Sequence, residues 1–170
     1  MVGMPTFPKD RQHFNIAIFV MLRNKQGEYL LQQRQNTSFL NGFWDTSASG
    51  HLERGETIKE CIVREAEEEA GVRVNIDSLK LVHVSQPELG NWPYIDFVFF
   101  SDDFEGEPLT NEAEKVSTLE WFKPEDFPEN LTLAATAYKN AGFPTDTLSY
   151  SFVNEADFER ITGQKYEREP

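Results

Sequence analysis

The chain has 170 residues, of which 39% are hydrophobic, and 14 of them are phenylalanine. These values fit a single domain over residues 1–170 with a sizeable buried core, and they argue against a disordered chain. The formal net charge of −13 argues against DNA or RNA as the main partner. We therefore expect a small-molecule substrate and no nucleic acid polymer.

The sequence also bears on where the protein works. Its one cysteine, Cys61, excludes an internal disulfide. No apolar run approaches the roughly 18 residues that a membrane-spanning helix needs, and residues 1–10 (MVGMPTFPKD) lack the apolar core of a signal peptide. We therefore expect a cytoplasmic protein with no membrane partner. The sequence does not indicate an oligomeric state.

An apolar stretch rich in β-branched residues opens the readable part of the chain. Residues 13–23 (HFNIAIFVMLR) predict a mostly buried strand. The turn sequence NKQG follows, and residues 28–35 alternate enough to predict the returning strand of a hairpin. Residues 36–50 are rich in small polar side chains, so we expect a loop there.

Helix signals follow this loop. Thr57 and Glu60 match a capping box and Gly71 is a C-terminal stop, so a helix is predicted over residues 57–70. Further strands are predicted over 79–86, 92–101 and 116–122, and further helices over 129–140 and 154–162. Because strands and helices mix without regular βαβ alternation, we expect an α/β fold with a mixed central sheet covered by helices on both sides.

Four glutamates crowd the end of the 57–70 helix. At roughly 100° per residue, Glu65, Glu68 and Glu69 fall within one arc beside the apolar face. Glu67 points about the opposite way. Like charges at this spacing destabilise a helix, and a divalent cation such as Mg²⁺, which takes hard oxygen ligands, would relieve the repulsion. Arg64, one turn before Glu68, can brace the cluster.

A wider window around this helix carries a known pattern. Residues 50–72 (GHLERGETIKECIVREAEEEAGV) resemble the signature of the Nudix hydrolases, and every fixed position is filled, although Ala66 is small for its aliphatic slot. The matching residues are Gly50, Glu56, Arg64, Glu65, Ala66, Glu68, Glu69, Gly71 and Val72. The flanking segments YLLQQRQ, FWDTSASGHLERGE and EKVSTLEWFKPEDFP are also similar to the family, so the resemblance covers a core of about 14–140.

The resemblance implies a fold and a reaction. The fold is an α/β/α sandwich. The reaction is the Mg²⁺- or Mn²⁺-dependent hydrolysis of a diphosphate linkage in a nucleoside di- or triphosphate, or in another nucleoside diphosphate derivative. Water attacks at phosphorus, and the partner is a small nucleotide.

The resemblance also assigns roles within the motif. Glu65, Glu68 and Glu69 would be metal ligands, with one of them a candidate general base. Glu56 and Arg64 would orient the loop and the helix. The glycines of the motif would shape the loop and end the helix; they are Gly50, Gly55 and Gly71.

Family members often use one more acid outside the motif. Glu112 and Glu114, before the 116–122 strand, are the candidates for a further ligand or base, although both also fit ordinary loop acids.

Substrate-binding candidates are also present. Phe43 and Trp44, with Phe39, could stack on a base or belong to the core. Asp96 could accept hydrogen bonds from a base edge or lie at an exposed edge. His51 could contact phosphate or the loop.

Several functions compete with a nucleoside triphosphate hydrolase. Pro87, 15 residues past Val72, is close to where ADP-ribose hydrolases of the family often carry a proline. An isopentenyl-diphosphate isomerase would need a cysteine where this chain has Ser47 and Ser49. A non-catalytic nucleotide-binding regulator would typically lose acids of the motif, and none is lost here.

Overall fold

The computed structural model describes residues 11–90 and 92–166. The segment 1–10, in which the sequence shows no signal-peptide core, lies outside the described residues. In the described part of the chain, no helix is both long and apolar enough to cross a membrane.

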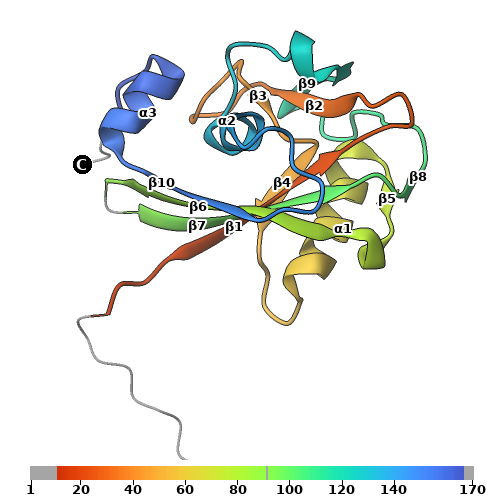
Figure 1. Ribbon diagram of the computed structural model, residues 1–170, viewed down its shortest axis with the longest axis horizontal. Helices are drawn as coiled ribbons and strands as arrows, with labels where there is room; N and C mark the ends of the chain where they lie inside the picture. Colours follow the sequence, from red (N-terminus) through yellow and green to blue (C-terminus); the bar gives the residue numbers. More distant parts are fainter. Residues whose placement is uncertain (1–10, 91, 167–170) are drawn as a thin grey trace, which may run out of the picture.

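A mixed sheet forms the centre of the molecule (Figure 1). Within the described residues it has five strands in the order β10-β6-β7-β1-β4. Their bounds are Asn15–Leu22 for β1, Ala48–His51 for β4, Lys80–Leu89 for β6, Trp92–Ser101 for β7 and Ser149–Val153 for β10. The β1/β7 and β6/β10 pairs are parallel, whereas β1/β4 and β6/β7 are antiparallel. The prediction of a mixed central sheet is confirmed.

The prediction of a β-hairpin over residues 13–35 is wrong. β2 (Tyr29–Arg34) lies in a separate sheet between β3 (Trp44–Asp45) and β9 (Val116–Phe122). Among the described residues, its backbone pairing with the β1 segment is limited to an isolated bridge from Arg23 to Tyr29. Residues 29–32 are all buried, so β2 needs cover on both faces. It therefore lies between two cores instead of beside β1.

The predicted loop over 36–50 is also partly wrong, because β3 and β4 lie within it. Both strands are short, and β4 (ASGH) begins with three small residues that give no alternating apolar pattern. Their smallness allows α1 to pack closely against β4. A further short pair, β5 (Arg73–Val74) with β8 (Phe104–Glu105), follows α1.

The helices agree with the sequence more closely. α1 spans Ile58–Ala70: Thr57 Oγ1 accepts a hydrogen bond from Glu60 N, Glu60 Oε2 accepts one from Thr57 N, and Gly71 ends the helix with φ 68°. α3 spans Glu155–Thr162. The capping box and the glycine stop of α1 are confirmed.

α2 begins later than the predicted residue 129. It spans Leu133–Asn140, and Thr132 is its N-cap. Before it, Asn130 O accepts from Trp44 N and Thr132 N donates to Trp44 O, so the preceding residues pair with β3 instead of starting the helix. Two 3₁₀ turns complete the described structure, Ile76–Ser78 and Pro124–Asp126.

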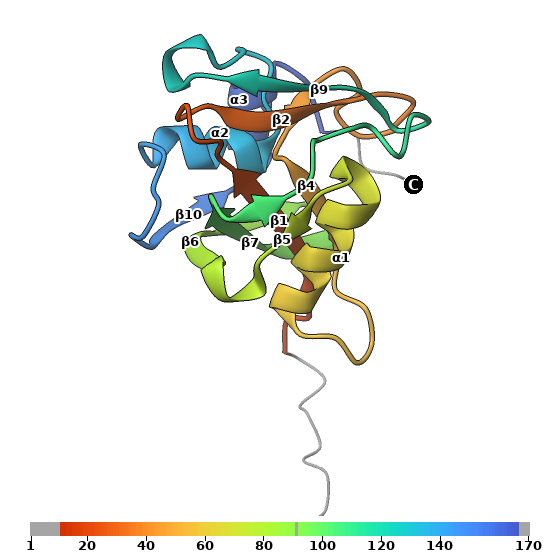
Figure 2. The ribbon, with the colours of Figure 1, turned by 90° about the vertical axis from the view of Figure 1, so that its right-hand side faces the viewer.

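The elements form three layers, with α1 on one face of the central sheet and α2 with the β3-β2-β9 sheet on the other (Figures 1 and 2). One core lies under α1 and includes Ile18 and Ile62. The second lies under α2 and includes Met21 and Tyr138. This is the predicted α/β/α sandwich, and it leaves the β4 edge of the central sheet between α1 and the smaller sheet.

We expect Thr57→Ala to lower the free energy of unfolding by about 1 kcal/mol, because it removes the N-cap acceptor of α1. Thr57→Ser keeps a hydroxyl, so its free energy of unfolding should be close to that of the unchanged protein. Urea unfolding of the three proteins measures this. Equal stability of the Ala and Ser variants would contradict the cap assignment.

Candidate active site

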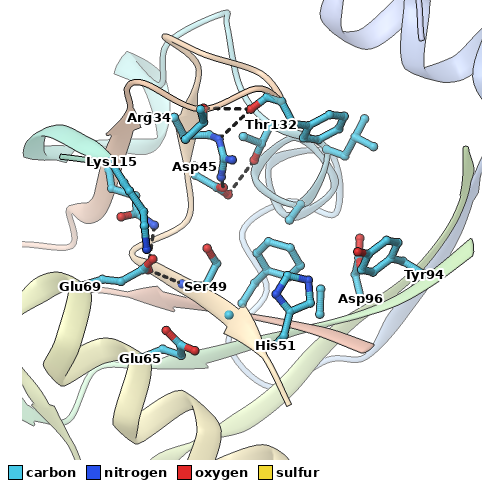
Figure 3. A pocket seen from close by; sticks show the side chains of 18 of the residues that line it. Arg34, Asp45, Ser49, His51, Glu65, Glu69, Tyr94, Asp96, Lys115 and Thr132 are labelled. Atoms are coloured by element: carbon cyan, nitrogen blue, oxygen red, sulfur yellow. Dashed lines mark hydrogen bonds and ion pairs between the residues drawn. The ribbon is translucent and has the colours of Figure 1, made fainter. Parts of the chain in front are cut away.

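A cleft of about 910 Å³ opens on the α2 face of the central sheet. β1, β4 and β7 form its floor, the C-terminal half of α1 one wall, and residues around Arg34 and Thr132 another (Figure 3). A volume of this size fits a small-molecule site. The cleft brings together most of the residues that the sequence singled out.

The motif carboxylates share this cleft. Glu65, Glu68 and Glu69 line it from α1, and Glu112 lines it from the segment before β9. Glu67 is exposed and lies 3.8 Å from Arg73 on the outside of α1. Glu114 does not line the cleft; its backbone oxygen accepts a hydrogen bond from Asn36.

Gly50 permits the closest contact in the site. A Cβ atom at this position would overlap the carboxylate of Glu65, which lies directly over the Gly50 backbone. The residue at this position must therefore be a glycine if the Glu65 carboxylate is to keep its place. Gly55 lies in the loop between β4 and α1.

Arg64 braces the carboxylates from behind. Its guanidinium lies 2.9 Å from Glu56 Oε1, 2.7 Å from Glu65 Oε1 and 3.3 Å from Glu68 Oε2. The hydrogen bonds from Arg64 lower the pKa of Glu56 to about 2. Arg64 is not among the residues that line the cleft, so its contacts fit an orienting role.

Glu69 is fixed by two donors. Its Oε2 accepts hydrogen bonds from Ser49 N at 2.7 Å and from Gln32 Nε2 at 3.1 Å. Burial raises the pKa of Glu69 to about 7. Gln32 is buried as well, and its Oε1 is the one buried side-chain nitrogen or oxygen without a partner in the described part of the chain.

The donor set fits a hard divalent cation. Four carboxylates line one cleft, beside the unpartnered amide oxygen of Gln32, and Mg²⁺ and Mn²⁺ prefer oxygen ligands. Among the described residues, no three His, Cys, Asp or Glu side chains stand close enough together to hold one ion. Arg64 instead pairs with Glu65 and Glu68.

The substrate-binding candidates divide into two groups. Asp96 and His51 line the floor of the cleft. Phe39 lines the cleft from the loop between β2 and β3, where its exposed ring stacks on Phe158 at 5.7 Å. Trp44 and Phe43 do not line it. The Trp44 ring packs edge-to-face against Phe122 at 4.9 Å, and Phe43 packs against the core cluster that contains Leu40 and Phe158.

A polar network that no sequence motif predicts lies on the wall opposite α1. Arg34 Nη1 lies 3.0 Å from Asp45 Oδ2, and Thr132 Oγ1 donates to Asp45 Oδ1 at 2.8 Å. Asp45 is almost completely buried, so the ion pair also holds the cleft wall together. Lys115 lines the cleft too, with Nζ 3.1 Å from Glu112 Oε2. These contacts depend on strand pairing that short-range patterns do not indicate.

Comparison with known proteins gives a consistent picture. The family model described as NUDIX domain matches residues 13–141. The uncharacterized Nudix hydrolase lin0387 of Listeria innocua is 28% identical over 142 residues, which cover 83% of this chain and 76% of that protein. The uncharacterized Nudix hydrolase PA4841 of Pseudomonas aeruginosa is 31% identical over 122 residues, which cover 69% and 68%.

A longer relative and two solved structures also match. The NAD-capped RNA hydrolase NudC of Klebsiella pneumoniae is 30% identical over 123 residues, 71% of this chain but only 44% of NudC. A MutT NUDIX hydrolase from Burkholderia pseudomallei has a TM-score of 0.69 at 22% identity, over 77% of this chain and 99% of that one. A MutT protein from Bacillus halodurans has a TM-score of 0.69 at 24% identity, over 86% and 94%. At these identities the structures support the fold alone.

We expect Gly50→Ala to weaken Mn²⁺ binding by about tenfold or more, because the added methyl group displaces the Glu65 carboxylate. Glu65→Ala and the double variant should lose Mn²⁺ affinity to the same extent, because each of the three variants removes the Glu65 carboxylate from its place. Titration with Mn²⁺, followed by electron paramagnetic resonance, measures this. Additive losses in the double variant would show that Gly50 and Glu65 act separately.

Asp96 should make folding stability depend on pH. Burial raises its pKa to about 7, whereas the ordinary value is 3.8. A raised pKa in the folded state means that the contribution of the group is fully present below about pH 4 and is lost as the pH rises to about 7. The stability of the unchanged protein relative to Asp96→Asn should therefore fall over this window and level off above it. Urea unfolding of both proteins at pH 5 and pH 8 measures this, and an equal difference at both values would contradict it.

Proposed function

The chain belongs to the Nudix family and is a pyrophosphohydrolase, and we propose that its cleft hydrolyses the diphosphate linkage of a nucleoside di- or triphosphate or of a nucleoside diphosphate derivative. The reaction is attack of water at phosphorus, with Mg²⁺ or Mn²⁺. The observation that carries the proposal is the meeting of Glu65, Glu68 and Glu69 in one cleft that is large enough for a nucleotide.

In this proposal the three glutamates of α1 bind the metal ion. A divalent ion held there neutralises the charge of a diphosphate and makes a bound water more acidic. Ser49 N and the side chain of Gln32 hold Glu69 in place. Arg64 keeps the Glu65 and Glu68 side chains on the cleft side of the helix.

Glu112 is the additional acid in this proposal. It lines the cleft beside the last turn of α1, where Asn111 N donates to Glu69 O, and there it can serve as a further ligand or accept a proton from the attacking water. The hydrogen bond from Lys115 to Glu112 raises the pKa of Lys115, so the amine stays charged. Lys115 and Arg34 are the lysine and the arginine among the described lining residues, and they could pair with a substrate phosphate.

A second substrate class has its own support. Pro87 lines the cleft, and the lining continues past it to Leu89, Gly90 and Tyr166. A nucleoside triphosphate would not need this extension, whereas an ADP-sugar carries a second moiety that could occupy it. ADP-ribose or another ADP-sugar is therefore the second candidate.

The isomerase and the regulator have less support. The one cysteine, Cys61, is completely buried, and burial raises the pKa of its thiol to about 12. Ser49 lies in the cleft where an isomerase would need a reactive thiol. A binding protein without turnover would not need the full set of acids that the cleft contains.

We expect Glu69→Gln to reduce turnover by about 10²-fold, because it keeps the shape of the side chain and removes one metal-binding charge. Glu67→Gln is the matched control and should stay within about threefold, since its exposed charge lies outside the cleft. The measurement is phosphate or nucleotide release with Mg²⁺ from a panel of ATP, dGTP, NADH and ADP-ribose. If the two variants were equally impaired, the metal-site assignment would be wrong. If the unchanged protein released nothing from any member of the panel, the proposed substrate class would be wrong.

A further inference from the structure

One row of residues crosses the floor of the cleft. In the register of the sheet, Ser85 of β6 pairs with Asp96 of β7, Asp96 with Ala17 of β1, and Ala17 with His51 of β4. Side chains opposite one another in a sheet project from the same face, so this row faces the cleft. The small side chain of Ala17 leaves Asp96 bordered by open space on the side of the acid cluster. Figure 3 shows Asp96 beside Tyr94, across the floor from Glu65 and Glu69.

Asp96 is buried with one hydrogen-bond partner. Its side chain is 5% exposed, and Ser85 Oγ donates to Asp96 Oδ2 at 3.1 Å. In the described part of the chain, no cation pairs with this carboxyl group and no donor reaches its other oxygen. A buried carboxylate with so little compensation is costly, so the neutral acid is favoured.

The other titratable groups near Asp96 do not change this balance. Asp45, on the opposite wall, adds negative charge and raises the pKa of Asp96 further. His51 of β4 and Tyr94 of β7 line the same floor without a hydrogen bond to Asp96. His83 of β6 is held by two serine hydroxyls of β10, and the residues of α2 that line the cleft are uncharged.

Ser85 also decides where the acid proton lies. Because its hydroxyl donates to Oδ2, the proton of the neutral acid belongs on Oδ1, the oxygen without a protein partner. We infer that Asp96 recognises the nucleobase of the substrate by donating a hydrogen bond from Oδ1 to a ring nitrogen or carbonyl oxygen of the base. This inference rests on the proposed function, and it reverses the expectation that Asp96 accepts hydrogen bonds from the base.

The position of Asp96 fits this role. Two strand spacings separate β7 from β4, roughly 10 Å, which is on the scale of the span from base to phosphate in a nucleotide. A nucleotide whose phosphates lie at Glu65 and Glu69 can therefore place its base over Ala17 and against Asp96. Asp96 is then a specificity residue, with no part in the attack on phosphorus.

The test compares AMP with ribose 5-phosphate, which carries the same phosphate but no base. Calorimetry with Mg²⁺ measures the binding of both to the full chain and to two variants. Asp96→Ala should weaken the binding of AMP by about tenfold and change the binding of ribose 5-phosphate by no more than about twofold. The affinity of Asp96→Asn for AMP should stay within about threefold of that of the unchanged protein. Ser85 can donate to the amide oxygen of the asparagine, which leaves the NH₂ group facing the cleft.

The pH dependence gives a second readout. The affinity of the unchanged protein for AMP, divided by that for ribose 5-phosphate, should fall by about tenfold between pH 6 and pH 8.5 as Oδ1 loses its proton. The ratio cancels the titration of the phosphate that both ligands share. Asp96→Asn cannot lose that proton, so its ratio should stay flat.

Several results would overturn the inference. One is that Asp96→Ala loses affinity for AMP and for ribose 5-phosphate equally, and another is that Asp96→Asn binds AMP as weakly as Asp96→Ala. A third is that the ratio of the two affinities in the unchanged protein does not change with pH, and a fourth is that AMP does not bind. None of these binding measurements requires turnover. If the protein hydrolyses nucleotides and the Asp96 variants bind AMP and ribose 5-phosphate in the same ratio as the unchanged protein, the inference alone fails. If AMP binding depends on Asp96 and no nucleotide is hydrolysed, the proposed function alone fails.

Discussion

The close packing of α1 against β4 is the contact on which the rest of the site depends. The Glu65 carboxylate occupies the space that a side chain at residue 50 would fill, and one turn later Glu69 accepts a hydrogen bond from Ser49 N. Helix and strand are thereby fixed in both distance and rotation. Displacing either element would move both carboxylates, so their positions depend on the backbone at residues 49 and 50.

This packing also concentrates negative charge where water is scarce. Glu69 has a raised pKa because it is buried, and Glu65 has a raised pKa for the same first reason, partly offset by Arg64. Arg64 contacts Glu65 and Glu68, and Lys115 contacts Glu112, so two cations face the four carboxylates of the cleft and electrostatic repulsion between the acids remains. In the proposed function, binding of a divalent cation would remove this cost, which is already present in the fold.

The features that could be predicted from the sequence are those that depend on residues close together in the chain. The caps and the charge arc of α1 depend on residues a few positions apart, and a helix of that phase is what the structure contains. The predicted hairpin failed because β2 pairs with β9, almost ninety residues away, for reasons that no local pattern contains. The contacts of Asp45 with Arg34 and Thr132 could not be predicted from the sequence for the same reason. For Trp44 the sequence left base stacking and core packing open, because an aromatic residue beside a small-residue loop fits both, and its ring packs against Phe122 in the core.

Two buried carboxyl groups in this cleft share a pKa of about 7 and still differ in what they can do. Glu69 lines the cleft together with Glu65 and Glu68, and in the proposed function these three acids bind the metal ion. Asp96 lies across the floor with a serine hydroxyl as its partner, and it has no neighbouring acid with which to share an ion. In the proposed site, similar burial therefore serves a metal-binding carboxylate at the β4 edge and a neutral hydrogen-bond donor on β7. That difference would orient a nucleotide with its phosphates toward α1 and its base toward Asp96.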